Sequence, residues 1–333
     1  MDLLHSLLLS LLSPMVLAFL LGIVATLLRS DLKIPDQIYA ALTIYLLFAI
    51  GLKGGAKLDG VSLADFARPV LAAVALCLTI PVWSYFLLRR LGRFDGINAA
   101  ALAAHYGSVS AVTFGESLAF LDLQKVAHEP FLPALLAVME VPAIVVALFL
   151  AGRQLTAAGA EGTKSGAAAP AGWGRVLHEL LTSKGIVLLL GGMAIGVLAG
   201  KKGFEQVGPF FDTPFRGVLT LFLLEIGLVT GRRLSDLRQA GPFLVAFALV
   251  MPFLHGLLGV VLGHWAGLGV GGATVLGTLA ASASYIAAPA AVRVALPQAN
   301  PALYLTASLA ITFPFNVVVG IPAYFTFARW LLA

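Results

Sequence analysis

The chain has 333 residues, of which 60% are hydrophobic and only 11% are charged. Because a soluble globular domain carries roughly 25% charged residues, this composition excludes a soluble protein and indicates one that crosses a membrane several times. The single cysteine excludes a disulfide framework and a cysteine-based metal site, and the net charge of +5 comes from Lys and Arg in short loops that set membrane topology, so we expect no nucleic-acid partner.

Ten apolar runs, bounded by charges, Gly or Pro, predict the membrane-spanning segments. In chain order the runs cover residues 14–29, 36–52, 69–89, 97–120, 130–152, 184–200, 215–231, 241–265, 271–293 and 301–332. A transmembrane helix needs about 20 predominantly apolar residues, and the runs are close to this length or longer. We therefore predict an all-α integral membrane protein with ten transmembrane helices.

The composition changes between the fifth and sixth runs, where residues 153–183 are rich in Ala, Gly, Ser and Thr. Such a segment is typical of a flexible linker, and it divides the chain into a first five-helix repeat (1–152) and a second one (184–333). The loops after the odd-numbered runs hold 13 of the 21 Lys and Arg residues. Since cytoplasmic loops carry an excess of these residues, we predict a cytoplasmic linker and both termini outside.

Four sequence markers recur in the same order in the two halves. Each has a counterpart 171 to 177 residues later: Ile50-Gly51-Leu52 and Ile226-Gly227-Leu228, Pro81 and Pro252, Leu102-Ala103-Ala104 and Leu279-Ala280-Ala281, Pro142 and Pro314. This order indicates an internal duplication. Because each unit has an odd number of spans, the second copy enters the membrane from the opposite side, and the halves are predicted to be inverted repeats, as in many secondary transporters.

The fourth and ninth runs each contain a polar stretch that predicts a broken helix. Gly107-Ser108-Val109-Ser110 lies in the fourth run, and Ser282-Ala283-Ser284-Tyr285, followed by Pro289, lies in the ninth. Ser caps a new helix start, and Pro is tolerated in a first turn. Each break points the partially positive N-terminus of a half-helix at the protein centre, and two such ends form an anion site. The alternative is that Ser and Gly only permit close helix packing.

These two polar stretches carry a resemblance to a known family, and two further segments add to it. The further segments are Arg293-Val294-Ala295-Leu296-Pro297-Gln298-Ala299-Asn300-Pro301 and Asp212-Thr213-Pro214-Phe215-Arg216-Gly217. Along nearly its whole length the chain resembles the sodium-dependent bicarbonate transporter family known from cyanobacteria, the SbtA-type permeases. The resemblance implies an elevator-type carrier with core and gate domains, in which broken helices four and nine cross at the midplane, bind bicarbonate and couple its uptake to sodium.

The resemblance also implies a homotrimer in a bacterial inner membrane, in contact with membrane lipid, and a small PII-like regulator on the cytoplasmic side. Two positions depart from the family pattern: Tyr285 stands where cyanobacterial members have an acid, and Ala111 stands where a Gly would follow in the fourth run. A carboxylate at the position of Tyr285 is the natural hard-oxygen ligand for sodium. The coupling ion therefore stays open between sodium and protons.

The candidate site residues follow from the breaks and from the buried polar groups around them. The candidate substrate-binding residues are Gly107, Ser108, Val109, Ser110, Ser282, Ala283, Ser284 and Tyr285. The candidate ion-coupling residues are Thr113, Glu140, Ser282 and Thr312. No resident cofactor or metal is expected, because the His residues have no metal-ligand spacing.

Acidic residues inside a membrane are costly and are therefore functional candidates by default. Glu140 lies at the level where the repeat places Thr312, and it can neutralise a cation or carry a proton near the site; the alternative is a structural pair with a helix end or a base. Glu116 and Glu225 are weaker candidates, with a structural ion pair as the alternative. Arg293 either attracts the anion or anchors a helix end.

The leading hypothesis is a secondary carrier for a small inorganic anion, bicarbonate by resemblance, in symport with sodium. One alternative is a proton-coupled or sodium-independent transporter of another small anion. A second is a cation/proton antiporter on a related scaffold, although neither break contains the carboxylate that this chemistry needs. A membrane-embedded enzyme needs a Ser/His/Asp or H-E-x-x-H arrangement, and the sequence has neither. Composition does not distinguish a carrier from a channel.

Overall fold

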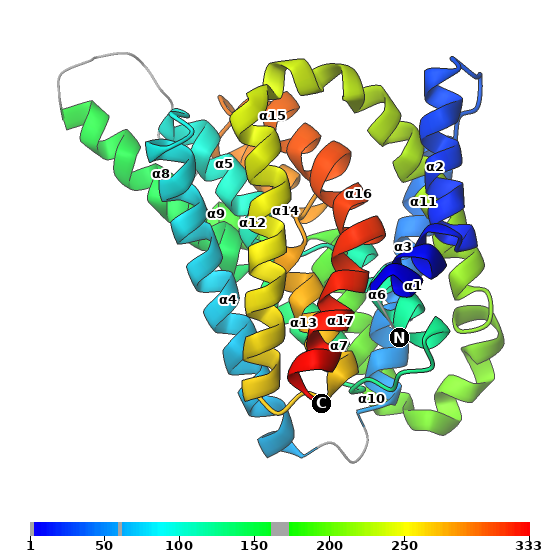
Figure 1. Ribbon diagram of the computed structural model, residues 1–333. Helices are drawn as coiled ribbons and strands as arrows, with labels where there is room; N and C mark the ends of the chain where they lie inside the picture. Colours follow the sequence, from blue (N-terminus) through cyan, green and yellow to red (C-terminus); the bar gives the residue numbers. More distant parts are fainter. Residues whose placement is uncertain (1–2, 59–61, 161–172) are drawn as a thin grey trace.

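The structure is a computed structural model that describes residues 3–58, 62–160 and 173–333. The apolar runs within these residues form helices (Figure 1). The elements up to residue 160 are α1 (Leu3–Leu11), α2 (Pro14–Leu27), α3 (Asp36–Ala56), α4 (Leu63–Arg90), α5 (Gly96–Gly107), α6 (Ala111–Leu123), α7 (Leu132–Glu140) and α8 (Pro142–Ala160). The later helices are α9 (Trp173–Leu181), α10 (Lys184–Phe211), α11 (Phe215–Arg233), the 3₁₀ helix η1 (Leu234–Asp236), α12 (Leu237–Trp265), α13 (Val270–Ala281), α14 (Ala287–Ala295), α15 (Pro301–Leu305), the π-helix η2 (Thr306–Thr312), α16 (Phe313–Phe315), the π-helix η3 (Asn316–Gly320) and α17 (Ile321–Leu331). These residues contain no β-strand, as the all-α prediction requires.

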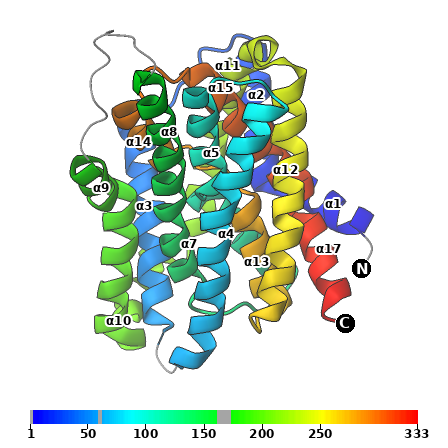
Figure 2. The same cartoon turned by 90° about the vertical axis from the view of Figure 1, so that its left-hand side faces the viewer.

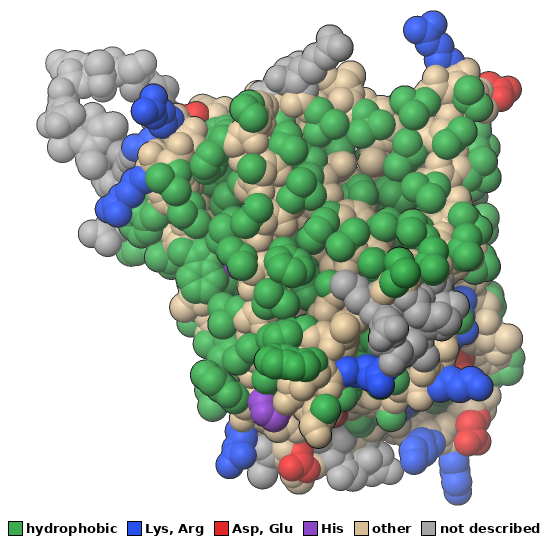
Figure 3. Space-filling view, viewed as in Figure 1, with side chains coloured by type: hydrophobic (Ala, Val, Ile, Leu, Met, Phe, Trp, Pro, Cys, Tyr) green, Lys and Arg blue, Asp and Glu red, His purple; other side chains and the backbone are tan. Residues whose placement is uncertain are grey.

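Six helical segments among the described residues are long and apolar enough to cross a membrane. They are Asp36–Ala56, Asp65–Arg90, Leu132–Gly152, Lys184–Phe211, Ala240–Trp265 and Pro301–Leu331. Figure 3 shows hydrophobic side chains over the middle of the molecular surface, whereas Lys, Arg, Asp and Glu gather toward its two ends. An apolar band between two charged ends is the surface that a lipid bilayer requires.

All ten predicted runs fall on helices, but several helices differ from their runs in length or continuity. The fourth run is divided between α5 and α6, and the ninth between α13 and α14. The sixth run ends at Gly200, where α10 has a kink: the φ of +62° and ψ of −171° at Gly200 are not helical and are accessible to glycine at little cost, and a further helical stretch follows to Phe211. Of the four prolines among the repeat markers, Pro142 and Pro314 lie where regular α-helix is interrupted, because Pro lacks an N–H and clashes with the preceding turn, whereas Pro81 and Pro252 lie inside α4 and α12.

The predicted flexible linker, 153–183, is only partly within the described residues. Residues 161–172 lie outside them. On either side, residues 153–160 continue α8 and residues 173–181 form α9, so both described parts are mainly helical. In the α8 part, Ala157, Ala158 and Ala160 favour this outcome, because Ala has the highest helix propensity of all residues.

Glycines bring two pairs of helices into close contact. α3 packs against α10, and α2 packs against α11 (Figures 1 and 2). Gly192 and Gly196 of α10 face α3, where a methyl group added at Gly196 would lie 2.7 Å from the amide nitrogen of Ala56. Gly22 and Gly227 meet in the same way between α2 and α11. The glycines at these four positions therefore serve helix packing.

The remaining long helices form a second group with its own internal contacts. α4 packs against α5 and α8, and α12 packs against α13 and α17. α6 and α14 approach the other half of the chain, since α6 contacts α13 and α14 contacts α5. This arrangement brings the interrupted fourth and ninth runs together in the interior.

Candidate functional site

The first break separates α5 from α6 by three residues in extended backbone. α5 ends at Gly107, and Ser108 follows with a φ of −87° and a ψ of 169°. Ser110 is the N-cap of α6, where its hydroxyl oxygen accepts a hydrogen bond of 3.2 Å from the amide of Thr113. Ser is favoured at this position because its side chain satisfies a backbone N–H that has no partner within the helix.

The second break separates α13 from α14 and is also built from serines. Ser282 follows the end of α13, and its hydroxyl donates a hydrogen bond of 2.8 Å to the carbonyl oxygen of Leu279. The hydroxyl oxygen of Ser284 accepts a hydrogen bond of 3.2 Å from the amide of Ala288 in the first turn of α14. Pro289 is the third residue of α14, where its missing N–H leaves no donor unsatisfied.

The two breaks are hydrogen bonded to each other. The amide of Ser284 donates a bond of 2.8 Å to the carbonyl oxygen of His105. The amide of Ser110 donates a bond of 3.0 Å to the hydroxyl oxygen of Ser282. Each interrupted helix therefore satisfies polar backbone groups of the other, as a break in a low-dielectric interior requires.

A cavity of about 270 Å³ lies between the breaks. Val109 and Ser110 line it from the first break, Ser284 and Tyr285 from the second, and Glu140 from the end of α7. The N-termini of α6 and α14 both begin at this cavity, and a helix N-terminus carries a partial positive charge and N–H groups without intrahelical partners. The arrangement has the donors that a small anion requires.

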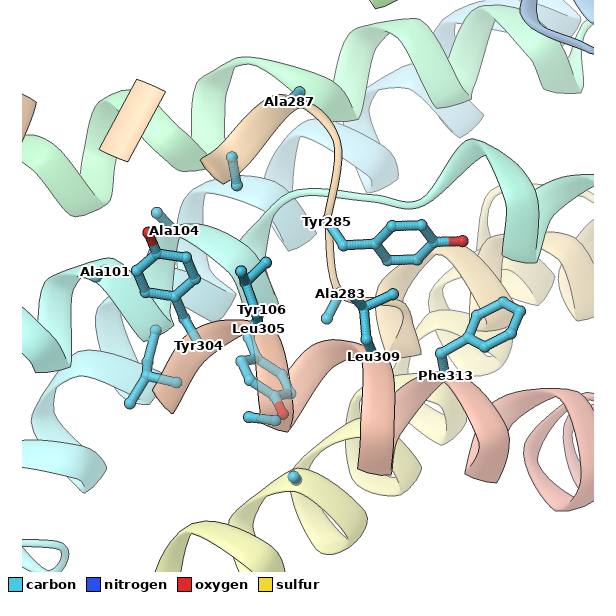
Figure 4. Close-up of a cluster of buried hydrophobic side chains, with 14 of the residues drawn as sticks. Ala101, Ala104, Tyr106, Ala283, Tyr285, Ala287, Tyr304, Leu305, Leu309 and Phe313 are labelled. Carbon is cyan, nitrogen blue, oxygen red and sulfur yellow. The ribbon is translucent and has the colours of Figure 1, made fainter. Parts of the chain in front are cut away.

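Tyr285 adds a buried hydroxyl that lies near the Ser110 side chain but makes no well-formed hydrogen bond among the described residues. In Figure 4 its side chain extends from the stretch before Ala287, and its ring meets that of Phe313 edge-on, with 5.7 Å between the ring centroids. A buried hydroxyl without a partner is costly. A ligand that accepts its hydrogen bond relieves that cost.

Five of the predicted site residues line the cavity, and the others lie around it. Ser108 donates a hydrogen bond of 2.8 Å to the carbonyl oxygen of Glu140, which ties the first break to α7. Gly107 packs closely against Pro81, so that a methyl group added at Gly107 would lie 2.8 Å from the Pro81 ring. The residues that lie outside the cavity lining are Gly107, Ser108, Thr113, Ser282, Ala283 and Thr312.

Thr312, one of the predicted ion-coupling residues, forms its hydrogen bonds outside the cavity between the breaks. Its hydroxyl donates a bond of 2.7 Å to the carbonyl oxygen of Ala248 and lies 2.8 Å from the Tyr106 hydroxyl. The repeat places Thr312 at the level of Glu140, but the two residues have different surroundings. Glu140 faces the cavity, whereas Thr312 joins η2 to α5 and α12.

The other predicted charged residues have separate environments. Glu225 accepts a hydrogen bond of 3.1 Å from Arg232, the structural ion pair that was its alternative interpretation. Glu116 is only 4% exposed, and one of its carboxylate oxygens has no hydrogen-bond partner among the described residues. Arg293 is exposed near the end of α14, which is the position expected of a helix-end anchor.

Five residues that line the cavity were not predicted: Ala111, Ile286 and Ala287 adjoin the breaks, and Leu47 and Gly185 come from the α3–α10 pair. Leu47 of α3 contributes an apolar wall. Gly185 of α10 lies so close to Glu140 that a methyl group added there would be 2.9 Å from the carboxylate Oε1. Neither Leu47 nor Gly185 carries a polar or periodic signal in the sequence, so only the tertiary arrangement reveals their place.

Residues 14–329 of the chain match the family sequence model of the Na⁺-dependent bicarbonate transporter superfamily. No curated protein matches the chain. The match includes both breaks, Glu140, and the α2–α11 and α3–α10 pairs.

Proposed function

We propose, because the chain belongs to the Na⁺-dependent bicarbonate transporter superfamily, that it takes up bicarbonate in symport with sodium and holds the anion between its two breaks. Membership of this family makes the chain a membrane transporter and not an enzyme. The observation that carries the proposed site is the cavity of about 270 Å³ at which two helix N-termini and the Ser110 and Ser284 side chains meet. Bicarbonate has three oxygens that accept hydrogen bonds from such groups.

The carboxylate of Glu140 gives a physical reason for coupling the anion to a cation. Two like unit charges about 4 Å apart repel by about 4 kcal/mol at an effective dielectric constant of about 20. An anion in the cavity beside an ionised Glu140 is therefore destabilised unless a cation enters with it or Glu140 takes up a proton. Sodium is the family's coupling ion, and we assign to it the neutralisation of this site.

The packing of the helices supports an arrangement of ten spans in two inverted repeats. α2 and α10 are counterparts in the predicted repeats, as are α3 and α11, so the α2–α11 contact in one pair is the counterpart of the α3–α10 contact in the other. Connections between the halves are reciprocal as well: Glu129 accepts a hydrogen bond of 2.7 Å from the amide of Gly269, and Asn98 accepts one of 2.8 Å from the amide of Asn300. A two-fold relation between the halves generates such exchanges.

In this proposal the α2, α3, α10 and α11 group is the gate domain, and the group that contains both breaks is the core domain that moves as an elevator. The carrier lies in a bacterial inner membrane with both termini outside and the linker in the cytoplasm. A homotrimer and a PII-like cytoplasmic regulator follow from the family resemblance. The two glycine-mediated helix pairs support the gate assignment, because close backbone packing makes a rigid unit.

A second candidate function rests on Glu140. The sequence shows no carboxylate in either break, but the structure places Glu140 at the cavity between them. A carboxylate in that position suits proton-coupled transport of a small anion, and it also suits cation/proton antiport. The helix N-termini favour the anion over the cation, because their partial charge is positive.

Uptake of labelled bicarbonate into proteoliposomes tests the proposal. An inward sodium gradient is compared with an inward proton gradient and with no gradient, each with the membrane potential clamped. We expect bicarbonate to accumulate with the sodium gradient alone. Accumulation with the proton gradient alone supports the second candidate, and accumulation with neither gradient contradicts symport.

A further inference from the structure

A second, larger cavity lies away from the breaks, at the end of the molecule where α3 ends and α11 begins. Its volume is about 580 Å³. Three cationic side chains line it: Lys53 and Lys57 from the end of α3 and Arg216 from the start of α11. Asp122 and His128 complete its polar lining. We name this cavity the basic vestibule.

The charges in the basic vestibule do not balance. Lys53 forms an ion pair with Asp212, and Arg216 forms one of 3.0 Å with Asp122. Lys57 has no ion-pair partner among the described residues. Counted over the described residues alone, the vestibule therefore keeps one positive charge in excess.

The environment of Lys57 makes this excess charge costly. Lys57 lies just beyond the end of α3 and is partly exposed, and its pKa is lowered, first by partial burial and then by the nearby Lys53 ammonium, against a smaller raising effect of Asp212 and Asp122. Burial and the like charge of Lys53 both disfavour the charged form of an amine. An anion beside Lys57 reverses the second effect, so the site as it stands favours an anionic ligand.

A third, apolar cavity lies between the basic vestibule and the cavity at the breaks and shares lining residues with both. This intermediate cavity has a volume of about 290 Å³ and shares Ile50 and Phe215 with the basic vestibule. At its other end it shares Leu47, Ala111 and Ile286 with the cavity between the breaks. The three cavities thus form one series from the surface to the breaks.

We propose that the basic vestibule is a capture site for small inorganic oxyanions, in which Lys57 supplies the decisive charge. The inference rests on the proposed function, since the captured anion is the one that the breaks bind. A positive cleft with apolar walls raises the local concentration of an anion and its rate of arrival. In the proposed orientation the vestibule opens to the outside, the side from which an uptake carrier receives its substrate.

Lys57→Gln tests the capture site through the kinetics of bicarbonate uptake. Lys125→Gln is the matched control, because Lys125 is exposed at the same end of the molecule and does not line the vestibule. We expect Lys57→Gln to raise KM about threefold to tenfold at low ionic strength with the maximal rate retained, and the difference to shrink at high salt, where exposed charges are screened. An unchanged KM at low ionic strength overturns the proposal.

A labelling measurement separates this inference from the proposed function. Purified protein is treated with a water-soluble amine reagent, and the labelling of Lys57 and Lys125 is quantified by mass spectrometry with bicarbonate or with gluconate at equal ionic strength. We expect bicarbonate to slow the labelling of Lys57 more than that of Lys125, also in a Ser110→Ala variant. Equal labelling rates overturn the capture site even where uptake is intact. Protection of Lys57 without any uptake by the wild type contradicts only the proposed function.

Discussion

The amide of Ser284 donates a hydrogen bond of 2.8 Å to the carbonyl oxygen of His105, two residues before the end of α5. The last carbonyls of a helix have no partners within it, and in a membrane interior water does not supply them. The amide of the second break thus donates a hydrogen bond to a carbonyl oxygen that the end of α5 leaves without a partner in its own helix. The two interruptions stabilise each other, and the cavity between them depends on both.

The first prediction concerns the serines that cap the half-helices. Ser110→Ala and Ser284→Ala remove hydroxyls that line the cavity, and we expect each to lower bicarbonate uptake at low substrate about 5-fold to 100-fold, since an unmade hydrogen bond to a charged group costs about 1–3 kcal/mol. Ser117→Ala is the control, because Ser117 is equally buried on α6 but bonds the carbonyl oxygen of Phe114. Normal uptake by both cavity variants removes the breaks from the mechanism.

The second prediction concerns Glu140. Glu140→Gln removes the negative charge from the cavity, so we expect bicarbonate to bind with little dependence on sodium and to equilibrate across the membrane without accumulating. Binding of labelled bicarbonate is measured with and without sodium. Glu225→Gln serves for comparison, because Glu225 pairs with Arg232 outside the cavity. A Glu140→Gln protein with the sodium dependence of the wild type shows that the carboxylate does not couple the ions.

The third prediction concerns the α3–α10 contact. A methyl group added at Gly196 meets the backbone of α3, whereas one at Gly191 has no atom within 4 Å. We expect Gly196→Ala to reduce stability by about 1–3 kcal/mol through overpacking. Gly191→Ala is expected to be neutral or stabilising, because Ala favours helix by about 1 kcal/mol over Gly. Thermal unfolding in detergent compares them, and equal midpoints contradict the close packing.

The fourth prediction concerns the contact between the halves at Glu129. Its carboxylate accepts a hydrogen bond from the amide of Gly269, the N-cap residue of α13. We expect Glu129→Ala to lower stability by about 0.5–2 kcal/mol, the usual cost of a lost N-terminal cap. Glu129→Gln keeps an oxygen acceptor and is expected to retain part of this stability. An equal loss in both variants shows that the negative charge, and not the hydrogen bond, is what stabilises the helix end.

The positions of the breaks could be predicted from the sequence because capping is local chemistry. Ser110 accepts a hydrogen bond from a residue three positions away, and Pro289 needs only its own turn to be tolerated. The apolar runs gave the helices for the same reason, since their signal is contained in about 20 consecutive residues. The sixth run ends at Gly200, where the structure has a kink with non-helical backbone, but the helical stretch from there to Phe211 was not predicted.

The lining of the cavity could be predicted only in part, because it depends on distant elements. Leu47 and Gly185 reach the breaks through the packing of α3 and α10, which no local pattern encodes. Thr312 was predicted by analogy with Glu140, but its neighbours are Tyr106 and Ala248. Repeats preserve the backbone path more closely than the side-chain environment, so a counterpart in sequence is not always a counterpart in chemistry.

A structure determined with saturating bicarbonate and sodium is the most direct test of the central claim. We predict density for one small anion between the N-termini of α6 and α14, within hydrogen-bond distance of the Ser110 and Ser284 side chains, with a cation beside Glu140. Density for the anion at another place, with the cavity between the breaks unchanged, would contradict the account.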